Sequence, residues 1–227
     1  GTTIDVGTNV IVTDAAGKVG IGTASPARAL EVYSTQPAIK LNNGTNAFTI
    51  GTGAFVDGSN SLVIYDEGVG ERMRIDAAGI VTKPLQPAFL AYPTARQQNI
   101  AASTSTIVLD AERFDQGGDF NTGTSTFTAP VTGKYQFNLN VRIGAELDNS
   151  ASYYRTLITT SNQTYYPAII DPNFTADLNY YHLCFSVLAD MDAGDTAYAQ
   201  VQQSGGGVKT DIDSSPENTN FSGYLVA

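Results

Sequence analysis

The chain is dominated by short stretches in which apolar and polar residues alternate. In the first third these stretches span residues 29–33, 38–41, 48–50 and 61–65, and Asn-Gly, Gly-Ser-Asn and Asp-Glu-Gly sequences separate them. Alternation with a period of two residues indicates half-buried β-strands, and the turn residues end each strand. The pattern therefore predicts β-structure throughout this region.

After residue 84 the apolar runs lengthen and aromatic residues become more frequent. Pro84 and Pro87 indicate a linker, so we place a boundary near residue 84 and predict two units, 1–83 and 84–227. Apolar or alternating runs in the second unit predict eight strands, at 88–92, 124–128, 134–142, 153–160, 165–170, 181–189, 197–203 and 220–226. Eight strands with no helical period between them are typical of an antiparallel sandwich or jelly roll.

Two of these strands carry specific expectations. Along 134–142 the residues Tyr135, Phe137, Leu139 and Val141 alternate with polar residues, which predicts a core-facing side. Strand 181–189 has apolar or small residues on both faces. We therefore expect it to be a central strand, covered by its own core on one side and by a neighbouring subunit on the other, within a trimer.

The strands of the first unit are too short to bury an apolar face alone. About 80 residues of this kind, with few large aromatic residues, are marginally stable as a monomer. We therefore expect a shaft in which three chains share their apolar faces. One segment recurs in it, since residues 14–19 read Asp-Ala-Ala-Gly-Lys-Val and residues 76–81 read Asp-Ala-Ala-Gly-Ile-Val. Asp and Gly bracket a tight turn in each copy, which predicts a repeated structural unit.

Charge excludes several classes of function. The net charge of -10 and the isoelectric point near 4.3 disfavour binding to nucleic acid or to an anionic membrane surface. No apolar stretch reaches the roughly 20 residues of a membrane span, and the first residues have no signal-peptide pattern. We expect the chain to continue a longer fibre or particle at its N-terminus. A single cysteine, Cys184, allows no internal disulfide and no zinc spacing.

No arrangement of residues indicates an enzyme. His182 and Cys184 share one face of strand 181–189, but a strand packed on both sides offers no cleft, so packing is the favoured role. Asp190, Asp192 and Asp195 lack the glycine and terminal glutamate of a calcium-binding EF-hand loop, which favours a solvated turn. A pair of carboxylates for glycoside hydrolysis, brought together only by folding, stays open as an alternative.

The first unit resembles the shafts of phage and other viral tail or head fibres. The resemblance rests on Gly-Lys-Val-Gly-Ile-Gly-Thr-Ala-Ser-Pro at 17–26, Ala-Leu-Glu-Val at 29–32 and Glu-Arg-Met-Arg-Ile-Asp at 71–76. It covers about residues 10 to 83. It implies a trimeric β-structured shaft.

The second unit resembles the globular heads of C1q and its TNF-like relatives. The resemblance rests on the phenylalanine and glycine pattern of 114–120, on 127–137, on Ala-Gly-Asp at 193–195 and on Phe-Ser-Gly-Tyr-Leu at 221–225. It implies a ten-stranded jelly roll, with the two additional strands inside 106–120, that forms a homotrimer and binds ligands without transforming them. No collagen tract precedes the head, because the shaft-like repeats occupy that place.

Loop lengths suggest where a receptor binds. The connections 129–133, 161–164 and 190–195 are short, whereas 93–123, 143–152, 171–180 and 204–219 are long. Because connections alternate between the ends of an antiparallel sandwich, we expect the long ones at the end distal to the shaft, where length costs little stability. The candidate receptor-binding residues there are Asp148, Asn149, Asn173, Asp177, Asn179, Tyr180, Lys209, Asp211, Asp213, Glu217 and Asn218.

Calcium is the one cofactor considered. Asp211 and Asp213 are its candidate ligands, in the loop itself or on a threefold axis where one carboxylate per chain becomes three. We otherwise expect no cofactor.

Three classes of function remain at this point. The first is a trimeric fibre tip on a virion surface that attaches to a glycan or protein receptor of a host cell, with a purely structural tail or capsid decoration as a variant. The second is a secreted bacterial C1q-like adhesin or lectin. The third is a fibre-borne enzyme that degrades surface glycan, which usually requires a longer catalytic domain.

Overall fold

The computed structural model describes residues 3–6 and 9–227, and it divides them into two compact units, Gly1–Leu85 and Gln86–Ala227. β-strands dominate both units. The one helix in the described part of the chain is a short 3-10 turn, η1 (Gly53–Phe55). Within that part, no helix has the length and apolar character that crossing a membrane requires.

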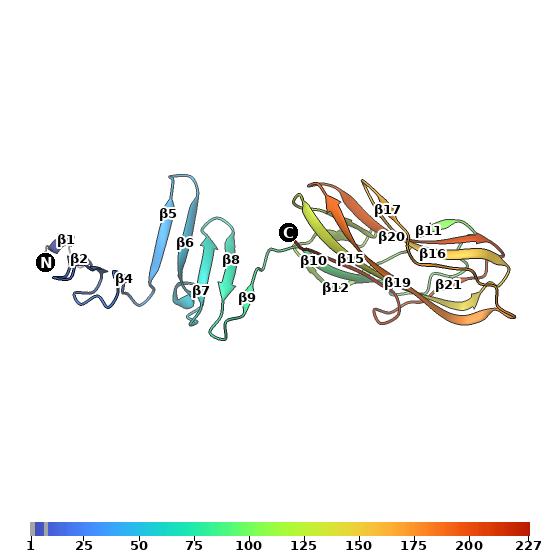
Figure 1. Cartoon of the computed structure of the whole chain (residues 1–227), viewed down its shortest axis with the longest axis horizontal. Helices are drawn as coiled ribbons and strands as arrows, with labels where there is room; N and C mark the ends of the chain where they lie inside the picture. The colour runs from blue at the N-terminus through green and yellow to red at the C-terminus, as the bar shows by residue number, and fades with distance from the viewer. Residues whose placement is uncertain (1–2, 7–8) are drawn as a thin grey trace. The chain divides into compact units, whose positions relative to one another are not determined.

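The N-terminal unit consists of two sheets. The first has the order β1 (Thr3–Val6), β2 (Asn9–Thr13), β3 (Val19–Ile21) and β4 (Leu30–Val32). Its β3 and β4 pair in parallel, whereas the other neighbours are antiparallel. The second sheet is an antiparallel meander of β5 (Ala38–Asn42), β6 (Ala47–Thr52), β7 (Leu62–Asp66), β8 (Gly70–Ile75) and β9 (Val81–Thr82) (Figure 1).

The repeated sequence forms the same turn twice. One carboxylate oxygen of Asp14 accepts the backbone N–H groups two and four residues later, both at 2.9 Å. Asp76 does the same at 2.8 and 2.9 Å. Gly17 and Gly79 then adopt φ values of 77° and 85°, which glycine reaches without a steric cost. The predicted repeat is therefore a repeat of hydrogen bonds as well as of residues.

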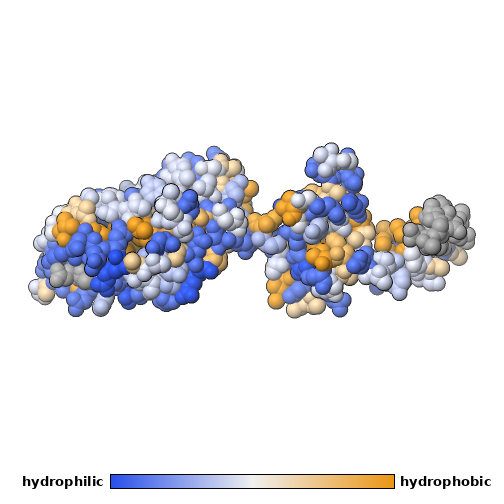
Figure 2. All heavy atoms as spheres, turned by 180° about the vertical axis from the view of Figure 1, so that it is seen from behind, coloured by the Kyte–Doolittle hydropathy of each residue, from blue (hydrophilic) through white to orange (hydrophobic). Residues whose placement is uncertain are grey.

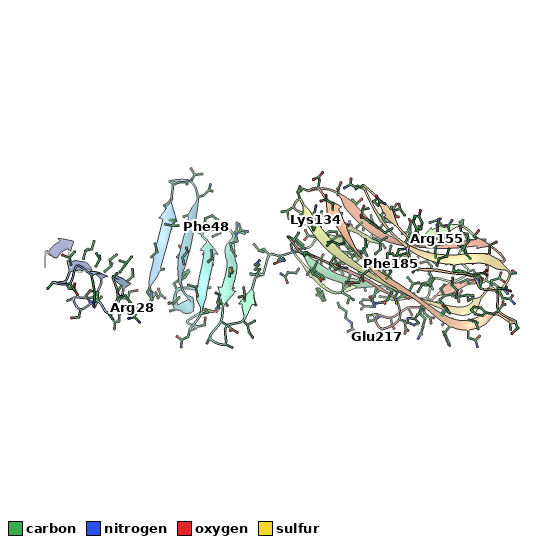
Figure 3. The ribbon with its side chains drawn as sticks, viewed as in Figure 1. Arg28, Phe48, Lys134, Arg155, Phe185 and Glu217 are labelled. Carbon is green, nitrogen blue, oxygen red and sulfur yellow. The ribbon has the colours of Figure 1, made fainter. Side chains whose placement is uncertain are left out.

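The meander of β5 to β9 buries little of its apolar surface within one chain. Val63 is the one valine, leucine or isoleucine that is fully buried in the described part of this unit. The register places Ile39 opposite Ile50 and Leu41 opposite Phe48, so these four side chains share a face, and all are exposed. Figure 3 labels Phe48 on this sheet, and Figure 2 shows hydrophobic side chains exposed over the middle of the same unit.

The C-terminal unit is a sandwich of two antiparallel sheets. One sheet has the order β12 (Ala111–Gln116), β10 (Ala88–Tyr92), β22 (Asn220–Leu225), β15 (Gly133–Leu147) and β19 (Leu178–Met191), with β21 (Asp211–Ile212) paired to β15. The other has the order β13 (Phe120–Asn121), β14 (Thr126–Thr128), β20 (Thr196–Gly205), β16 (Ala151–Thr160) and β17 (Thr164–Tyr165). Two short strands complete it, β11 (Thr104–Thr106) on β20 and β18 (Ile169–Ile170) on β16.

The aromatic core lies between these sheets. The predicted face of β15 is fully buried, since Tyr135, Phe137, Leu139 and Val141 are at most 1% exposed. Neighbouring aromatic rings pack against one another here, some stacked and others edge-on or tilted, at centroid distances of 4.9 to 6.5 Å. Gly223 lies under these rings, because a Cβ there would be 2.5 Å from the Phe137 ring.

Several sequence expectations need correction here. The strands expected at 134–142 and 181–189 are longer, so the connection expected at 143–152 shrinks to the turn 148–150. The strand expected at 165–170 is interrupted and forms β17 and β18.

The position of β19 also differs from the expectation. It is an edge strand that pairs only with β15 on its sheet, and His182 and Cys184 on its outer face are exposed. Small and apolar residues on both faces were compatible with a central strand, but pairing across the sheet is decided by contacts distant in sequence.

Candidate functional site

The two ends of the sandwich differ in what they contain. At one end the turns 129–132 and 192–195 bind each other, since the Ala129 N–H donates to the Asp195 carbonyl and the Gly194 N–H to the Ala129 carbonyl, both at 2.8 Å. The Lys134 N–H donates to the Ala227 carbonyl at 2.7 Å, so the C-terminus lies at this end, where Figure 3 labels Lys134. Strand β10 also begins here, as its first residue pairs with Tyr224.

At the opposite end the turn 148–150, the loop 171–177 and the first part of the loop 206–219 converge. The Asn149 N–H donates to the Asp177 carboxylate at 2.9 Å, and its side-chain amide donates to the Phe174 carbonyl at 3.2 Å. Lys209 forms an ion pair with Asp177 and lies 3.6 Å from Asp148. The structure therefore brings these predicted residues together from three separate segments, and we call them the distal loop cluster.

Asp148 is the buried centre of this cluster. It is 1% exposed, and its carboxylate accepts the Ser150 N–H and hydroxyl at 2.9 and 2.7 Å and also the Gly207 N–H. Burial by itself raises the pKa of Asp148, but the hydrogen bonds from Gly207 and Ser150 outweigh it and lower the pKa to about 2. Asp148 therefore holds the loops in place and presents no surface to a receptor.

Asp177 is half-buried beside it and has a similar role. Hydrogen bonds from the Asn149 backbone and from Lys209 lower the pKa of Asp177 below its usual range. The carboxylate thus stays ionised and retains its ion pair at neutral pH.

Asp211 and Asp213 form a second buried group. Arg96 lies 3.5 Å from Asp211 and 2.5 Å from Asp213. The Nε of Arg142 donates to Asp213 at 2.6 Å, and the Asn99 N–H donates to Asp211 at 2.8 Å. The two carboxylates are 6% and 3% exposed.

Guanidinium groups thus supply the countercharge that a calcium ion was expected to supply. The two carboxylates therefore have countercharges within one chain, and their assignment as calcium ligands stays a prediction. No group of three or more His, Cys, Asp or Glu side chains in the described residues is arranged to hold a metal ion. Sequence reasoning missed Arg96 as a partner because it lies more than a hundred residues from Asp211 along the chain, and no local pattern joins them.

Tyr180 is the most prominent exposed residue of the predicted set. It is 61% exposed near the start of β19, and the Arg142 guanidinium lies 5.1 Å from its ring centroid. Because Asp213 fixes Arg142, the buried ion pair also orients this exposed ring. Asn179, the residue before it, and Asn173 in the loop 171–177 are also exposed.

Glu217 and Asn218 lie apart from this cluster. Glu217 pairs with Arg113 at 2.9 Å on β12, which is the edge of the sheet opposite to β19. Asn218 donates to the Ser214 carbonyl at 3.0 Å. The structure therefore does not bring these two predicted residues to the distal loop cluster.

Two of the other titratable residues considered from sequence, Asp190 and Asp195, have polar partners in the structure. Asp190 pairs with Lys134 at 2.5 Å, and Asp195 accepts the Asn162 amide at 2.7 Å and the Asp192 N–H at 2.8 Å. His182 and Cys184 pair in register with Arg142 and Asn140, and within the described residues their side chains make no hydrogen bond.

The two antiparallel sheets of the C-terminal unit form a jelly roll with loops gathered at one end. The model of the C1q domain matches residues 88–226, and the chain belongs to the C1q family. A search of curated proteins finds no match.

Two solved structures are similar in structure to part of this chain. The globular domain of zebrafish complement 1qA is 17% identical, with 63% of this chain and 98% of that chain covered and a TM-score of 0.46. Murine APRIL at pH 8.5 is 9% identical, with 62% and 99% covered and a TM-score of 0.46.

Proposed function

We propose that this chain is the receptor-binding end of a trimeric fibre, with the N-terminal unit as part of a shaft and the C1q domain as its head. The observation that carries the proposal is the distal loop cluster. It forms at the end of the sandwich opposite to the one where the chain enters and leaves. A site at that end is free to meet a partner while the rest of the fibre is attached at the other.

The recognition surface consists of the exposed residues near this cluster. Asn173, Asn179 and Tyr180 offer amide and aromatic groups, which suit a glycan or a protein surface. Two buried carboxylates support this surface. Asp148 holds the loops together through its bond to Gly207, and Asp213 holds the Arg142 side chain. Rigid support reduces the entropy lost on binding, so the buried ion pairs contribute to affinity indirectly.

Two findings support a trimer, and a trimer suits this role. C1q and TNF homologues are homotrimers that bind receptors. In the N-terminal unit, the exposed face with Ile39, Leu41, Phe48 and Ile50 requires a cover, and copies of the same chain supply it in a shaft. Three heads then present three copies of one site, which raises avidity without any new contact.

The particle that carries the fibre is proposed from the shaft resemblance. Repeated Asp-Ala-Ala-Gly turns before a head favour a virion of the phage type, with the chain at its outer surface and without catalytic activity. A secreted bacterial adhesin with the same head is the second candidate, favoured by the C1q domain alone. A purely structural fibre is a further candidate, and it would bind no receptor at the distal loop cluster.

Cell binding by the labelled full chain tests the proposal. We expect binding to some members of a panel of bacterial strains, and we expect Tyr180→Ala and Asn173→Ala to reduce it by about tenfold when combined, as two interface contacts do. Thr128→Ala, on β14 and outside the cluster, is the matched control and retains full binding. Equal binding by all variants would assign attachment to another surface, and failure to bind any strain would favour the structural fibre.

A further inference from the structure

The second sheet of the head, which contains β16 and β20, carries almost no charge. Its strands β11, β13, β14, β16, β17, β18 and β20 contain one charged residue between them, Arg155 on β16. The other sheet includes Glu112, Asp190 and Asp211, and the chain as a whole has 22 acidic and 12 basic residues. Arg155 is therefore a single cation on an otherwise neutral sheet of an acidic protein.

Arg155 projects from the outer face of this sheet. Tyr154 and Thr156 on either side of it are fully buried in the sandwich, and side chains alternate along a strand, so Arg155 points away from the core. The register places Gln202 of β20 opposite Arg155, and Thr104 of β11 opposite Gln202. These three side chains form a row across the outer face of the sheet, on which Figure 3 labels Arg155.

The guanidinium group of Arg155 is held in place by its neighbours. Its Nε donates to the side-chain oxygen of Gln202 at 2.5 Å. Its central carbon lies 5.5 Å from the ring centroid of Tyr153 and 4.4 Å from that of Tyr166. Because these contacts restrict a long side chain before any ligand arrives, less conformational entropy is lost on binding.

The terminal nitrogens of Arg155 remain available to a ligand. Among the residues that the structure describes, the bond to Gln202 is the one hydrogen bond of this side chain, and no carboxylate forms an ion pair with it. Asp171 follows β18, but its carboxylate accepts the Asn173 N–H at 3.1 Å. A ligand can therefore bind the guanidinium without breaking an internal ion pair.

A second arginine of the head shows which group completes such an arrangement. Arg113 on β12 also lies over a tyrosine, 5.8 Å from the ring centroid of Tyr92, and it pairs with the Glu217 carboxylate at 2.9 Å. A guanidinium presents its N–H groups in a planar fork that matches the two oxygens of a carboxylate. Arg155 has the same aromatic support, so the group that suits it is a carboxylate supplied by the ligand.

We propose that this surface, which we call the Arg155 face and define as Tyr153, Arg155, Gln202 and Thr104, binds a glycan that carries a carboxylate, such as a uronic acid or a sialic acid. The carboxylate accepts hydrogen bonds from Arg155, and the apolar side of the sugar ring packs on Tyr153. The amide of Gln202 and the hydroxyl of Thr104 bind sugar hydroxyl groups. The row from Arg155 to Thr104 is polar and lacks the apolar centre of a protein interface, which favours a glycan over an acidic protein.

The net charge of -10 does not prevent an anion from binding here. At physiological ionic strength, charges on the surface that lie more than about 8 Å apart are largely screened from each other. The contact with the guanidinium is direct, so the local cation outweighs carboxylates elsewhere on the head.

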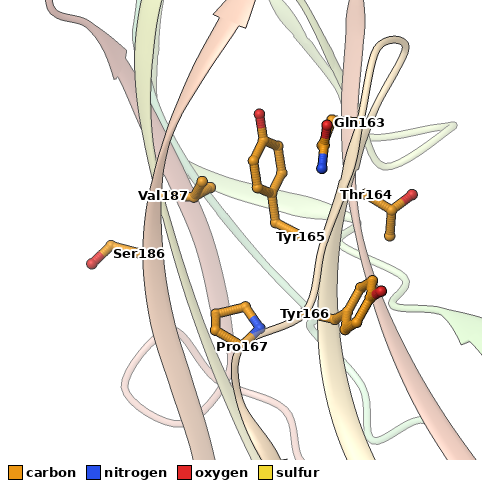
Figure 4. A pocket seen from close by; sticks show the side chains of 7 residues that line it. All are labelled: Gln163, Thr164, Tyr165, Tyr166, Pro167, Ser186 and Val187. Atoms are coloured by element: carbon orange, nitrogen blue, oxygen red, sulfur yellow. The ribbon is translucent and has the colours of Figure 1, made fainter.

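The Arg155 face lies away from the side on which we expect a neighbouring subunit. That subunit is expected at β19 on the other sheet, and Figure 4 shows Tyr165 turned toward β19 and Tyr166 turned away from it. β17 and β18 lie on one side of β16 and β20 on the other, and the Nε of Arg155 bonds toward β20. A trimer contact at β19 therefore leaves Arg155 and Gln202 accessible from outside.

The test is isothermal titration of the full chain with two acidic sugars and their uncharged counterparts. Digalacturonate is compared with its dimethyl ester, and sialyllactose with lactose, so the two pairs distinguish a uronic from a sialic acid. We expect at least one acid to bind with one site per chain. We expect its uncharged counterpart to bind at least about tenfold more weakly, because the bonds to the guanidinium are weakened.

Variants locate the binding on the surface. We expect Arg155→Gln to weaken binding of the acid about tenfold. Arg113→Gln changes the net charge equally and is the matched control, and it leaves the affinity within a factor of two. Thermal unfolding of each variant is measured alongside. If Arg155→Gln does not fold, Arg155→Lys replaces it, and we expect about fivefold weaker binding because the charge stays and the planar fork is lost.

Several outcomes would overturn the proposal. These are no binding of either acid, equal binding of the uncharged counterparts, or equal effects of Arg113→Gln and Arg155→Gln. One site per trimer would also overturn it, because a neighbouring subunit would then cover or complete the face. Tighter binding of a triglutamate peptide would assign Arg155 to a protein partner instead. Tyr180→Ala, in the receptor surface proposed at the distal loop cluster, should leave the sugar affinity unchanged, so the two proposals fail separately.

Discussion

The carboxylate of Asp148 accepts the backbone N–H of Gly207, 59 residues further along the chain. The approach depends on Gly206, which has a φ of 75° and would place a Cβ 2.6 Å from that carboxylate. One buried acid thereby joins the turn 148–150 to the loop 206–219. The stability of the distal loop cluster should accordingly depend on this one side chain.

Replacement of Asp148 by asparagine tests this dependence. The variant loses charge-assisted bonds to Gly207 and Ser150, so we expect the free energy of unfolding to fall by about 1–3 kcal/mol. Chemical denaturation measures the change. Asp171→Asn, at an exposed position of the loop 171–177, is the control and should change stability by less than about 0.5 kcal/mol. Equal effects would mean that Asp148 is not the centre of the cluster.

The same carboxylate predicts a dependence of stability on pH. The pKa of Asp148 is lowered from 3.8 to about 2 in the folded chain, so its contribution is complete above pH 4 and is lost as the pH falls through 2. This difference corresponds to roughly 2 kcal/mol. Denaturation midpoints between pH 5 and pH 2 should therefore fall more steeply for the wild type than for Asp148→Asn. Parallel curves would contradict the shift.

Gly144 leaves room for the Asp213 carboxylate. A Cβ at this position would lie 2.7 Å from an oxygen of Asp213, and the backbone there is not in a left-handed conformation, so the effect of Gly144→Ala is steric. We expect a loss of about 1–3 kcal/mol as the ion pair with Arg142 is displaced. Gly68→Ala, whose Cβ would be 3.5 Å from its nearest neighbour, is the control. Thermal unfolding compares the two variants.

Arg96 and Arg142 already neutralise Asp211 and Asp213, which predicts the response to metal removal. Addition of EDTA should leave the thermal unfolding midpoint of the full chain unchanged. A decrease of several degrees would show a metal contribution and restore the expectation of calcium on a threefold axis.

The exposed face of the β5–β9 sheet predicts self-association. Phe48→Ser combined with Leu41→Ser should lower the mass in solution from that of a trimer, because buried apolar surface is lost at each contact. Lys40→Ser is the control on the opposite face, since Lys40 pairs with Thr49 and not with the apolar row. Light scattering measures the mass. A wild-type monomer, or equal masses for all three proteins, would contradict a shared face.

Sequence patterns were sufficient wherever short-range contacts decide the structure. The Asp14 and Asp76 turns follow from hydrogen bonds within five residues, and the buried face of β15 follows from alternation along one strand. The resemblance of the head to the C1q family could also be recognised from the sequence, because each of its motifs is a contiguous stretch of residues. These features depend on local geometry and on a period that any β-strand shares.

Tertiary structure decided the rest, because it joins residues far apart in the chain. The edge position of β19, the burial of Asp148 and the pairing of Arg96 with Asp213 all depend on which segments meet. Of the predicted receptor residues, the fold buries Asp148, Asp211 and Asp213 and leaves Tyr180 exposed. A linear pattern records which residues are polar, but burial and partners arise only when the sheets pack.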